Sequence, residues 1–295
     1  KVHIKGNVGV SITTGLNYYL KYYCNVHVSQ QTENTVMPEE MPQIKETIRT
    51  SSPYEVRYAY NYCTLSYTMP FYGYDEWQRE LDYLALSGVN LILDTTATEA
   101  LWVMYLQQFG YTLDEAKNFV CGYAYKAWWL MGNLENYGGS VSDSWIVDTL
   151  ELARVNQRFM TVLGIQPCLQ GFMGTLPTTF EEIASENLEN RGFAAIDKYM
   201  VAQGTWSGFT RPPLLKTTYD GYKTLADTFY DTQKFLYGDI TDYYAGDLAH
   251  EGGVIPTDLS RSQMTSEILG YMMDNDEDAV WIIQCWWGNP EKAVL

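Results

Sequence analysis

Apolar, β-branched runs alternate with amphipathic stretches from about Val56 to the end of the chain. Short apolar runs are typical of buried strands, whereas apolar residues spaced at i, i+4 and i+7 are typical of helices. The clearest helix is predicted at 74–88, where Trp77, Leu81 and Leu84 have this spacing. The pattern predicts a parallel sheet with helices outside it, and its strands are expected in residues 56–67, 89–95, 165–171, 240–245 and 279–287.

The first 53 residues have a different organisation. The runs "KVHIKG", "VGVSITTGLNYYLKYY" and "VHVSQQ" predict a short strand, a helix and a second strand. The polar stretch 32–53 that follows predicts a linker. We therefore expect part of a small N-terminal α/β domain with its linker at 1–53, and a second domain at 54–295.

The second domain fits a barrel better than an open sheet. A doubly wound sheet that binds a nucleotide usually has a Gly-rich phosphate loop after its first strand, and residues 61–77 contain no GxGxxG motif. A complete (β/α)8 barrel usually takes about 250 residues. Here a stretch of roughly that length supplies only the five predicted strands. The sequence predicts an α/β fold with a truncated (β/α)8 TIM barrel, incomplete at its C-terminus, as expected for a fragment of a longer protein.

Composition narrows the possible partners. The chain has 36 acidic against 19 basic residues and a net charge of −17, which argues against nucleic acid because phosphate binding needs a basic surface. No apolar run reaches the roughly 20 residues of a membrane span. Five cysteines without a CxxC pair and three histidines argue against a zinc site and a disulfide framework.

Polar and aromatic side chains follow the predicted strands, which is where a barrel places its functional residues. Carboxylates, amides and flat rings together suit sugar binding. A structural interpretation stays open for each: tryptophan in the core, Cys63 as a small buried residue, Asp94 as a helix cap and Glu251 as a turn residue. The candidates are Asn61, Cys63, Tyr67, Asp94, Trp128, Gln170, Asp247, His250, Glu251, Gln284, Trp286 and Trp287.

Four segments occur in an order that resembles the alpha-N-acetylglucosaminidases, glycoside hydrolase family 89: "YNYCTLSYTMPFYGYDEWQRELDYLALSGVNLIL", "AWWLMGNL", "LGIQPCLQGFMGTLP" and "AVWIIQCWW". The resemblance implies a small α/β domain before the barrel and a helical domain after it. It also implies a retaining exo-glycosidase that removes terminal alpha-linked N-acetylglucosamine from glycoconjugates with two glutamates. This implied mechanism needs no metal or organic cofactor, so we expect none. The family motif matched by "DLAHEGG" gives Glu251 the role of general acid/base. The nucleophile is expected beyond Leu295, so this chain alone is expected to be inactive.

The same resemblance implies the sugar-binding residues. Asn61 and Cys63 match the family's "N-x-C", Trp128 matches its "AW", and Trp286 matches the aromatic after its fifth strand. His250 matches the "HEGG" form of the motif. We expect Glu251 to contact Trp128 or Trp286, because all three lie at strand ends or in βα loops. The implied partner is a mucin-type or heparan sulfate-like glycan with terminal alpha-GlcNAc. The implied location is secreted or cell-surface in a bacterium and lysosomal in a eukaryote.

Two other functions fit the residues. One is a non-catalytic carbohydrate-binding barrel fragment, which a second strand-end glutamate further along the protein would argue against. The other is a different carboxylate-dependent barrel enzyme, for example one with Asp94, Asp247 and Glu251 as metal ligands. A chelator would lower the activity of the metal-dependent enzyme and leave a glycosidase unaffected.

Overall fold

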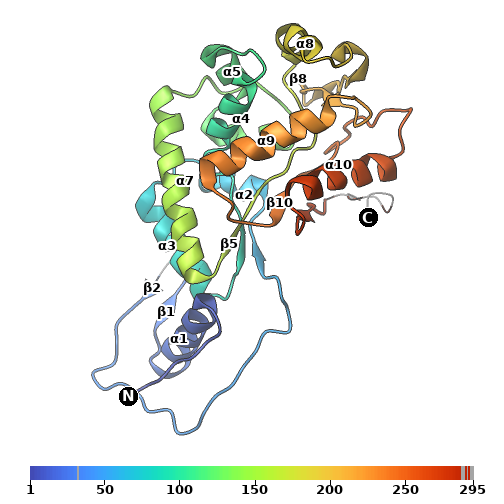
Figure 1. Ribbon diagram of the computed structural model, residues 1–295. Coiled ribbons are helices and arrows are strands. Elements are labelled where there is room, and N and C mark those ends of the chain that lie inside the picture. Colours follow the sequence, from blue (N-terminus) through green and yellow to red (C-terminus); the bar gives the residue numbers. More distant parts are fainter. Residues whose placement is uncertain (32, 287–289, 291, 293–295) are drawn as a thin grey trace. The chain divides into compact units, whose positions relative to one another are not determined.

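The computed structural model describes residues 1–31, 33–286, 290 and 292 (Figure 1). The chain divides into two compact units, and each is described by itself. The first contains residues 1–60, 72–93 and 154–167, and the second contains residues 61–71, 94–153 and 168–295.

The first unit is built on two predicted helices, α1 (Gly9–Tyr23) and α3 (Tyr74–Leu86). The Thr13 hydroxyl on α1 donates to the Ala85 carbonyl at 2.7 Å, which ties the helices together. Their apolar faces share one core, because the period of 3.6 residues places apolar side chains on one side of each helix. This core contains Val10, Leu81, Leu84, Ala85, Ile92, Met160 and Ile165.

Two strand predictions in the first unit are wrong or too long. Residues 1–6 form no strand, whereas the second predicted strand is present in part as β1 (His27–Val28), which pairs antiparallel with β2 (Glu33–Asn34). The strand predicted at 56–67 is only two residues long, β3 (Tyr58–Ala59). Tyr60 has a φ of 76°, in the left-handed region that breaks a strand, and helix α2 (Tyr62–Tyr67) follows. The apolar pattern of the sequence therefore extends beyond Tyr60, although the backbone turns there and the strand has ended.

The other predicted strands are present and parallel. β3 pairs with β4 (Leu91–Leu93), and β10 (Tyr243–Ala245) pairs with both β5 (Gln166–Gln170) and β11 (Val280–Ile282). The hydrogen-bonded order is β11-β10-β5-β4-β3. The parallel α/β arrangement predicted from the sequence is confirmed, and it places the ends of β5, β10 and β11 at one edge of the sheet.

The second unit has most of the helices, and α9 (Tyr222–Tyr237) and α10 (Arg261–Asn275) run side by side in it (Figure 1). Two short antiparallel pairs lie between α8 (Phe180–Asn190) and α9 in the sequence. They are β6 (Met200–Val201) with β9 (Leu214–Leu215), and β7 (Thr205–Trp206) with β8 (Phe209–Thr210). The long helix α7 (Asp143–Leu163) starts in the second unit and ends in the first. The remaining elements of the second unit are α4 (Thr98–Gln107), α5 (Leu113–Phe119), η1 (Tyr123–Tyr125), α6 (Lys126–Leu130) and η2 (Ile196–Tyr199).

Aromatic rings fill the core of the second unit. Trp102 meets Phe119 and Phe229 edge-on, with ring centroids 5.1 and 5.2 Å apart. Its indole Nε1 donates to Gln170 Oε1 at 3.0 Å, so the polar residue at the end of β5 is satisfied inside the core. Many of the aromatic residues of the chain are therefore structural. Within the described part of the chain, no helix combines the length and apolarity that crossing a membrane requires.

Candidate active site

The loop after β10 carries Glu251 in an unusual backbone conformation. Ala249 and Glu251 have φ values of 55° and 45°, in the left-handed region that residues with a side chain seldom adopt. The Asp247 carboxylate braces the loop: one oxygen accepts from the Gln284 backbone N–H at 3.1 Å, and the other lies 3.2 Å from His250 Nδ1. His250 is buried, at 4 % exposed. The loop is therefore fixed by its own polar residues and by the segment after β11.

The Glu251 carboxylate lies between two indole N–H groups. Trp206 Nε1 donates to Oε2 at 2.6 Å, and Trp286 Nε1 donates to Oε1 at 3.1 Å. His250 Nε2 lies 3.9 Å from Oε1. The Glu251 side chain keeps 33 % of its surface exposed, so solvent and a ligand can reach it. The expected contact between Glu251 and one of the two predicted tryptophans is present, and Trp286 makes it.

Trp128, the second predicted tryptophan, packs against Trp206, which donates to the Glu251 carboxylate. Trp128 stacks on Trp206 with ring centroids 6.5 Å apart and an angle of 28° between the planes. Tyr67 meets Trp128 edge-on at 5.3 Å, and it is 74 % exposed. Flat exposed rings beside an acceptor group suit the apolar face of a sugar ring.

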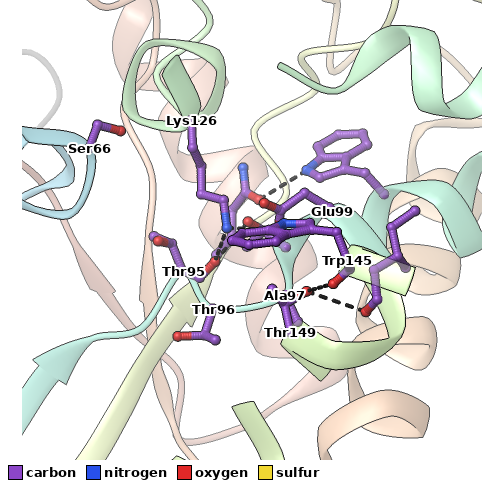
Figure 2. A network of polar contacts seen from close by, with 12 residues as sticks. Ser66, Thr95, Thr96, Ala97, Glu99, Lys126, Trp145 and Thr149 are labelled. Carbon is purple, nitrogen blue, oxygen red and sulfur yellow. Dashed lines mark hydrogen bonds and ion pairs between the residues drawn. The ribbon is translucent and has the colours of Figure 1, made fainter. Parts of the chain in front are cut away.

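Polar contacts hold α6, the helix that carries Trp128 (Figure 2). Lys126 Nζ forms an ion pair with the fully buried Glu99 at 2.7 Å and donates to the Thr95 carbonyl at 3.1 Å. The Ala127 backbone N–H donates to Ser66 Oγ at 2.8 Å. A short helix has little stability of its own, so these contacts at its first two residues fix where Trp128 is presented.

The two residues of the predicted "N-x-C" pair lie at the start of α2, not in a strand. The Asn61 side chain caps this helix by accepting from the Thr64 backbone N–H at 2.9 Å. Cys63 is half-buried. Burial raises the pKa of the Cys63 thiol, and the negative charge of Glu251 raises it further. Cys63 is therefore close enough to Glu251 to feel its charge, whereas the Asn61 oxygen is engaged by the helix.

Sequence reasoning missed two residues that contact the Glu251 loop. Trp206 belongs to the hairpin formed by β7 and β8, and Arg211 follows that hairpin. Both occur in a stretch that the hydrophobic pattern describes only as irregular. An arginine next to two prolines in an acidic chain was the only local signal. Trp287, the last predicted strand-end residue, lies outside the described residues.

Asp94, Asp247 and Glu251, the ligands of the alternative metal-dependent enzyme, are not grouped into a metal site. Among the described residues, no group of three or more His, Cys, Asp or Glu side chains is placed to hold a metal ion. Asp94 accepts from the Thr96 backbone N–H at 2.9 Å, in the turn before α4. Its role as a helix cap is also wrong in detail, because the N-cap position of α4 is Ala97.

Comparisons with known proteins place the chain in a family. A family model described as "Alpha-N-acetylglucosaminidase (NAGLU) tim-barrel domain" matches residues 57–294, and the model of the N-terminal domain of the same family matches residues 1–43. A human alpha-N-acetylglucosaminidase is 33% identical over 177 residues, which are 60% of this chain and 24% of the human protein.

Solved structures support the same family. A family 89 glycoside hydrolase from Clostridium perfringens in complex with PUGNAc is 41% identical, with a TM-score of 0.91. A variant of the Clostridium protein with two Glu→Gln substitutions, in complex with its substrate GlcNAc-alpha-1,4-galactose, is 40% identical, also with a TM-score of 0.91. Both matches cover 98% of this chain and 32% of the other, so the chain spans about a third of the solved relatives. The TIM-barrel fold predicted from the sequence is confirmed, and the chain belongs to the alpha-N-acetylglucosaminidases, glycoside hydrolase family 89.

Proposed function

We propose that the protein is a retaining exo-glycosidase that removes terminal alpha-linked N-acetylglucosamine from glycoconjugates, with Glu251 as its general acid/base. The observation that carries the proposal is the Glu251 carboxylate, held by the indole N–H groups of Trp206 and Trp286 and a third exposed to solvent. A carboxyl group that is fixed on two sides and open on another can exchange a proton with a bound ligand.

A retaining glycosidase uses its acid/base carboxyl twice. It first donates a proton to the leaving oxygen, while a second carboxylate about 5 Å away attacks the anomeric carbon. It then removes a proton from the water that releases the sugar. Between these steps Glu251 is ionised, and the two indole N–H groups stabilise that state because charged acceptors form stronger hydrogen bonds.

The substrate assignment comes from relatives. The Clostridium protein was solved with GlcNAc-alpha-1,4-galactose after two glutamates had been replaced by glutamine. Two substituted glutamates are compatible with a mechanism that uses two carboxylates, and Glu251 supplies one such carboxylate in our proposal. Its partner nucleophile is expected beyond Leu295, which follows from the family resemblance.

The sugar-binding roles of Asn61, Cys63, Trp128, His250 and Trp286 are part of the proposal. Trp128 and Trp286 offer rings for the apolar face of the sugar, and the buried His250 offers a polar group next to Glu251. Asn61 needs to give up or share its bond to Thr64 to bind a hydroxyl. A secreted, cell-surface or lysosomal location stays a prediction from the resemblance.

The decisive test is Glu251→Gln in the natural full-length polypeptide. The amide keeps the shape but cannot transfer the proton, so kcat on a GlcNAc-alpha-linked disaccharide should fall by about 10² to 10⁴ while KM changes little. An aryl glycoside with a good leaving group needs no proton in the first step. With that substrate, azide should restore turnover, because azide attacks the glycosyl-enzyme without a general base.

The matched control is Glu181→Gln, on the exposed first turn of α8 in the same unit, which should leave kcat unchanged. Proton NMR of the first-formed sugar should show the alpha anomer. Unchanged turnover of the disaccharide by Glu251→Gln would refute the role of Glu251. Binding without hydrolysis by the wild-type protein would instead favour a carbohydrate-binding module.

A further inference from the structure

A buried guanidinium lies behind the Glu251 loop. Arg211 directly follows β8 and is 4 % exposed. Its Nη1 donates to the Glu251 carbonyl at 3.0 Å, its Nη2 donates to the His250 carbonyl, and its Nε donates to the Gly132 carbonyl at 3.1 Å. The guanidinium is planar and rigid, so it fixes these three carbonyls relative to one another.

Arg211 carries a positive charge inside the protein. None of the ion pairs within the described residues includes it. A buried charge usually needs a charged partner, because leaving water is costly. Burial lowers the pKa of Arg211, and the negative charge of Glu251 opposes that effect. The Glu251 carboxylate therefore favours the charged form of Arg211, as do the three carbonyls that accept from it.

The backbone that Arg211 contacts is the strained one. Ala249 and Glu251 both have left-handed φ values, which a residue with a side chain adopts only when its surroundings hold it there. Arg211 contacts the carbonyls of the two residues that follow Ala249, and it joins them to Gly132 in the segment after α6. Besides the contacts of Asp247, the loop conformation therefore depends on Arg211, a side chain that the loop does not itself contain.

We infer that Arg211 is a positioning residue that holds the Glu251 backbone so that its carboxyl group stays between Trp206 and Trp286. The inference rests on the proposed acid/base role of Glu251. Arg211 contacts backbone carbonyls and acts on the reaction only through Glu251. A displacement of a catalytic group by about 1 Å is enough to slow a reaction by about 10²-fold, so replacing the Arg211 guanidinium should lower kcat.

The test compares Arg211→Met and Arg211→Lys in the natural full-length polypeptide. Arg211→Met should lower kcat on a GlcNAc-alpha-linked disaccharide by about 10²-fold with little change in KM. Arg211→Lys keeps the charge but cannot reach three carbonyls at once, so it should lie between Arg211→Met and wild type. With an aryl glycoside, whose leaving group needs no proton, glycosyl-enzyme formation should be slowed much less. Arg191→Met is the control: Arg191 also donates to a backbone carbonyl, that of Gln108 at 3.0 Å, and its loss should leave kcat unchanged.

A double variant separates a role through Glu251 from a general loss of structure. If Arg211 acts through Glu251, then Arg211→Met should slow the Glu251→Gln enzyme no further. Additive losses, or equal losses on both substrates, would overturn the inference and leave the proposed function intact. No effect of Glu251→Gln alone would overturn the proposed function, and the inference with it. If Arg211→Met does not fold, Arg211→Lys serves in the same comparisons.

Discussion

Replacing Lys126 by methionine should destabilise the protein far more than replacing an ordinary surface lysine. Lys126 Nζ lies 2.7 Å from a Glu99 carboxylate oxygen, and Glu99 is 0% exposed (Figure 2). Neither Glu99 oxygen accepts a hydrogen bond from another of the described residues, apart from the ion pair. Lys126→Met therefore leaves a buried carboxylate without its counter-charge.

The magnitude follows from this geometry. At an effective dielectric constant of about 20, two unit charges 2.7 Å apart attract each other by about 6 kcal/mol. The desolvation already paid by Glu99 is not recovered when the lysine is lost. Breaking a buried ion pair by removing one partner typically costs about 3–5 kcal/mol, and we expect a loss in this range. Because α6 carries Trp128, Lys126→Met should also weaken sugar binding.

The assay is urea unfolding followed by tryptophan fluorescence, with the free energy of unfolding compared between variants. Lys223→Met is the control, because Lys223 pairs with Asp227 at 2.9 Å on the surface, with side chains 51% and 37% exposed. It should cost less than about 1 kcal/mol. The double variant Glu99→Leu with Lys126→Met removes both charges and should be more stable than Lys126→Met. The reasoning is refuted if Lys126→Met costs no more than Lys223→Met.

Two further predictions follow from burial. Burial raises the pKa of Glu135 above its ordinary value of 4.5, despite the bond from the Thr178 backbone N–H at 3.1 Å. The folded state then binds the Glu135 proton more tightly than the unfolded state, so stability is lost as pH rises from about 4.5 through the folded pKa. Glu135→Gln should reduce that loss in urea unfolding at stepped pH, and an unchanged pH dependence would contradict it. Burial also raises the pKa of the Cys121 thiol to about 12, while Cys285 is exposed. A thiol reagent at about pH 8 should modify Cys285 in the native protein and Cys121 only after unfolding, and mass spectrometry that finds native Cys121 modified would count against this.

Much of the fold could be predicted because its signals are local. The apolar spacing that predicted α1 and α3 is a property of neighbouring residues on one helix face. The runs that became β4, β5 and β10 are largely buried on both faces, as is usual for parallel strands, whereas β11 at the end of the strand order is only partly buried. The error at residues 56–67 has a local cause too, since alternating apolar residues do not reveal that Tyr60 turns the backbone and Asn61 starts a helix.

The sequence by itself determined the main strands of the parallel sheet, helices α1 and α3, and the family of the chain, and through the family resemblance it pointed to Glu251 as the carboxylate of the proposed site. Only the tertiary structure decided what surrounds that carboxylate. Trp206 is 45 positions and Arg211 is 40 positions away from Glu251 along the chain, and neither belongs to a periodic segment. The physical reason is that periodicity and capping depend on residues a few positions apart, whereas a hydrogen bond between distant loops depends on where the packed strands and helices place their ends.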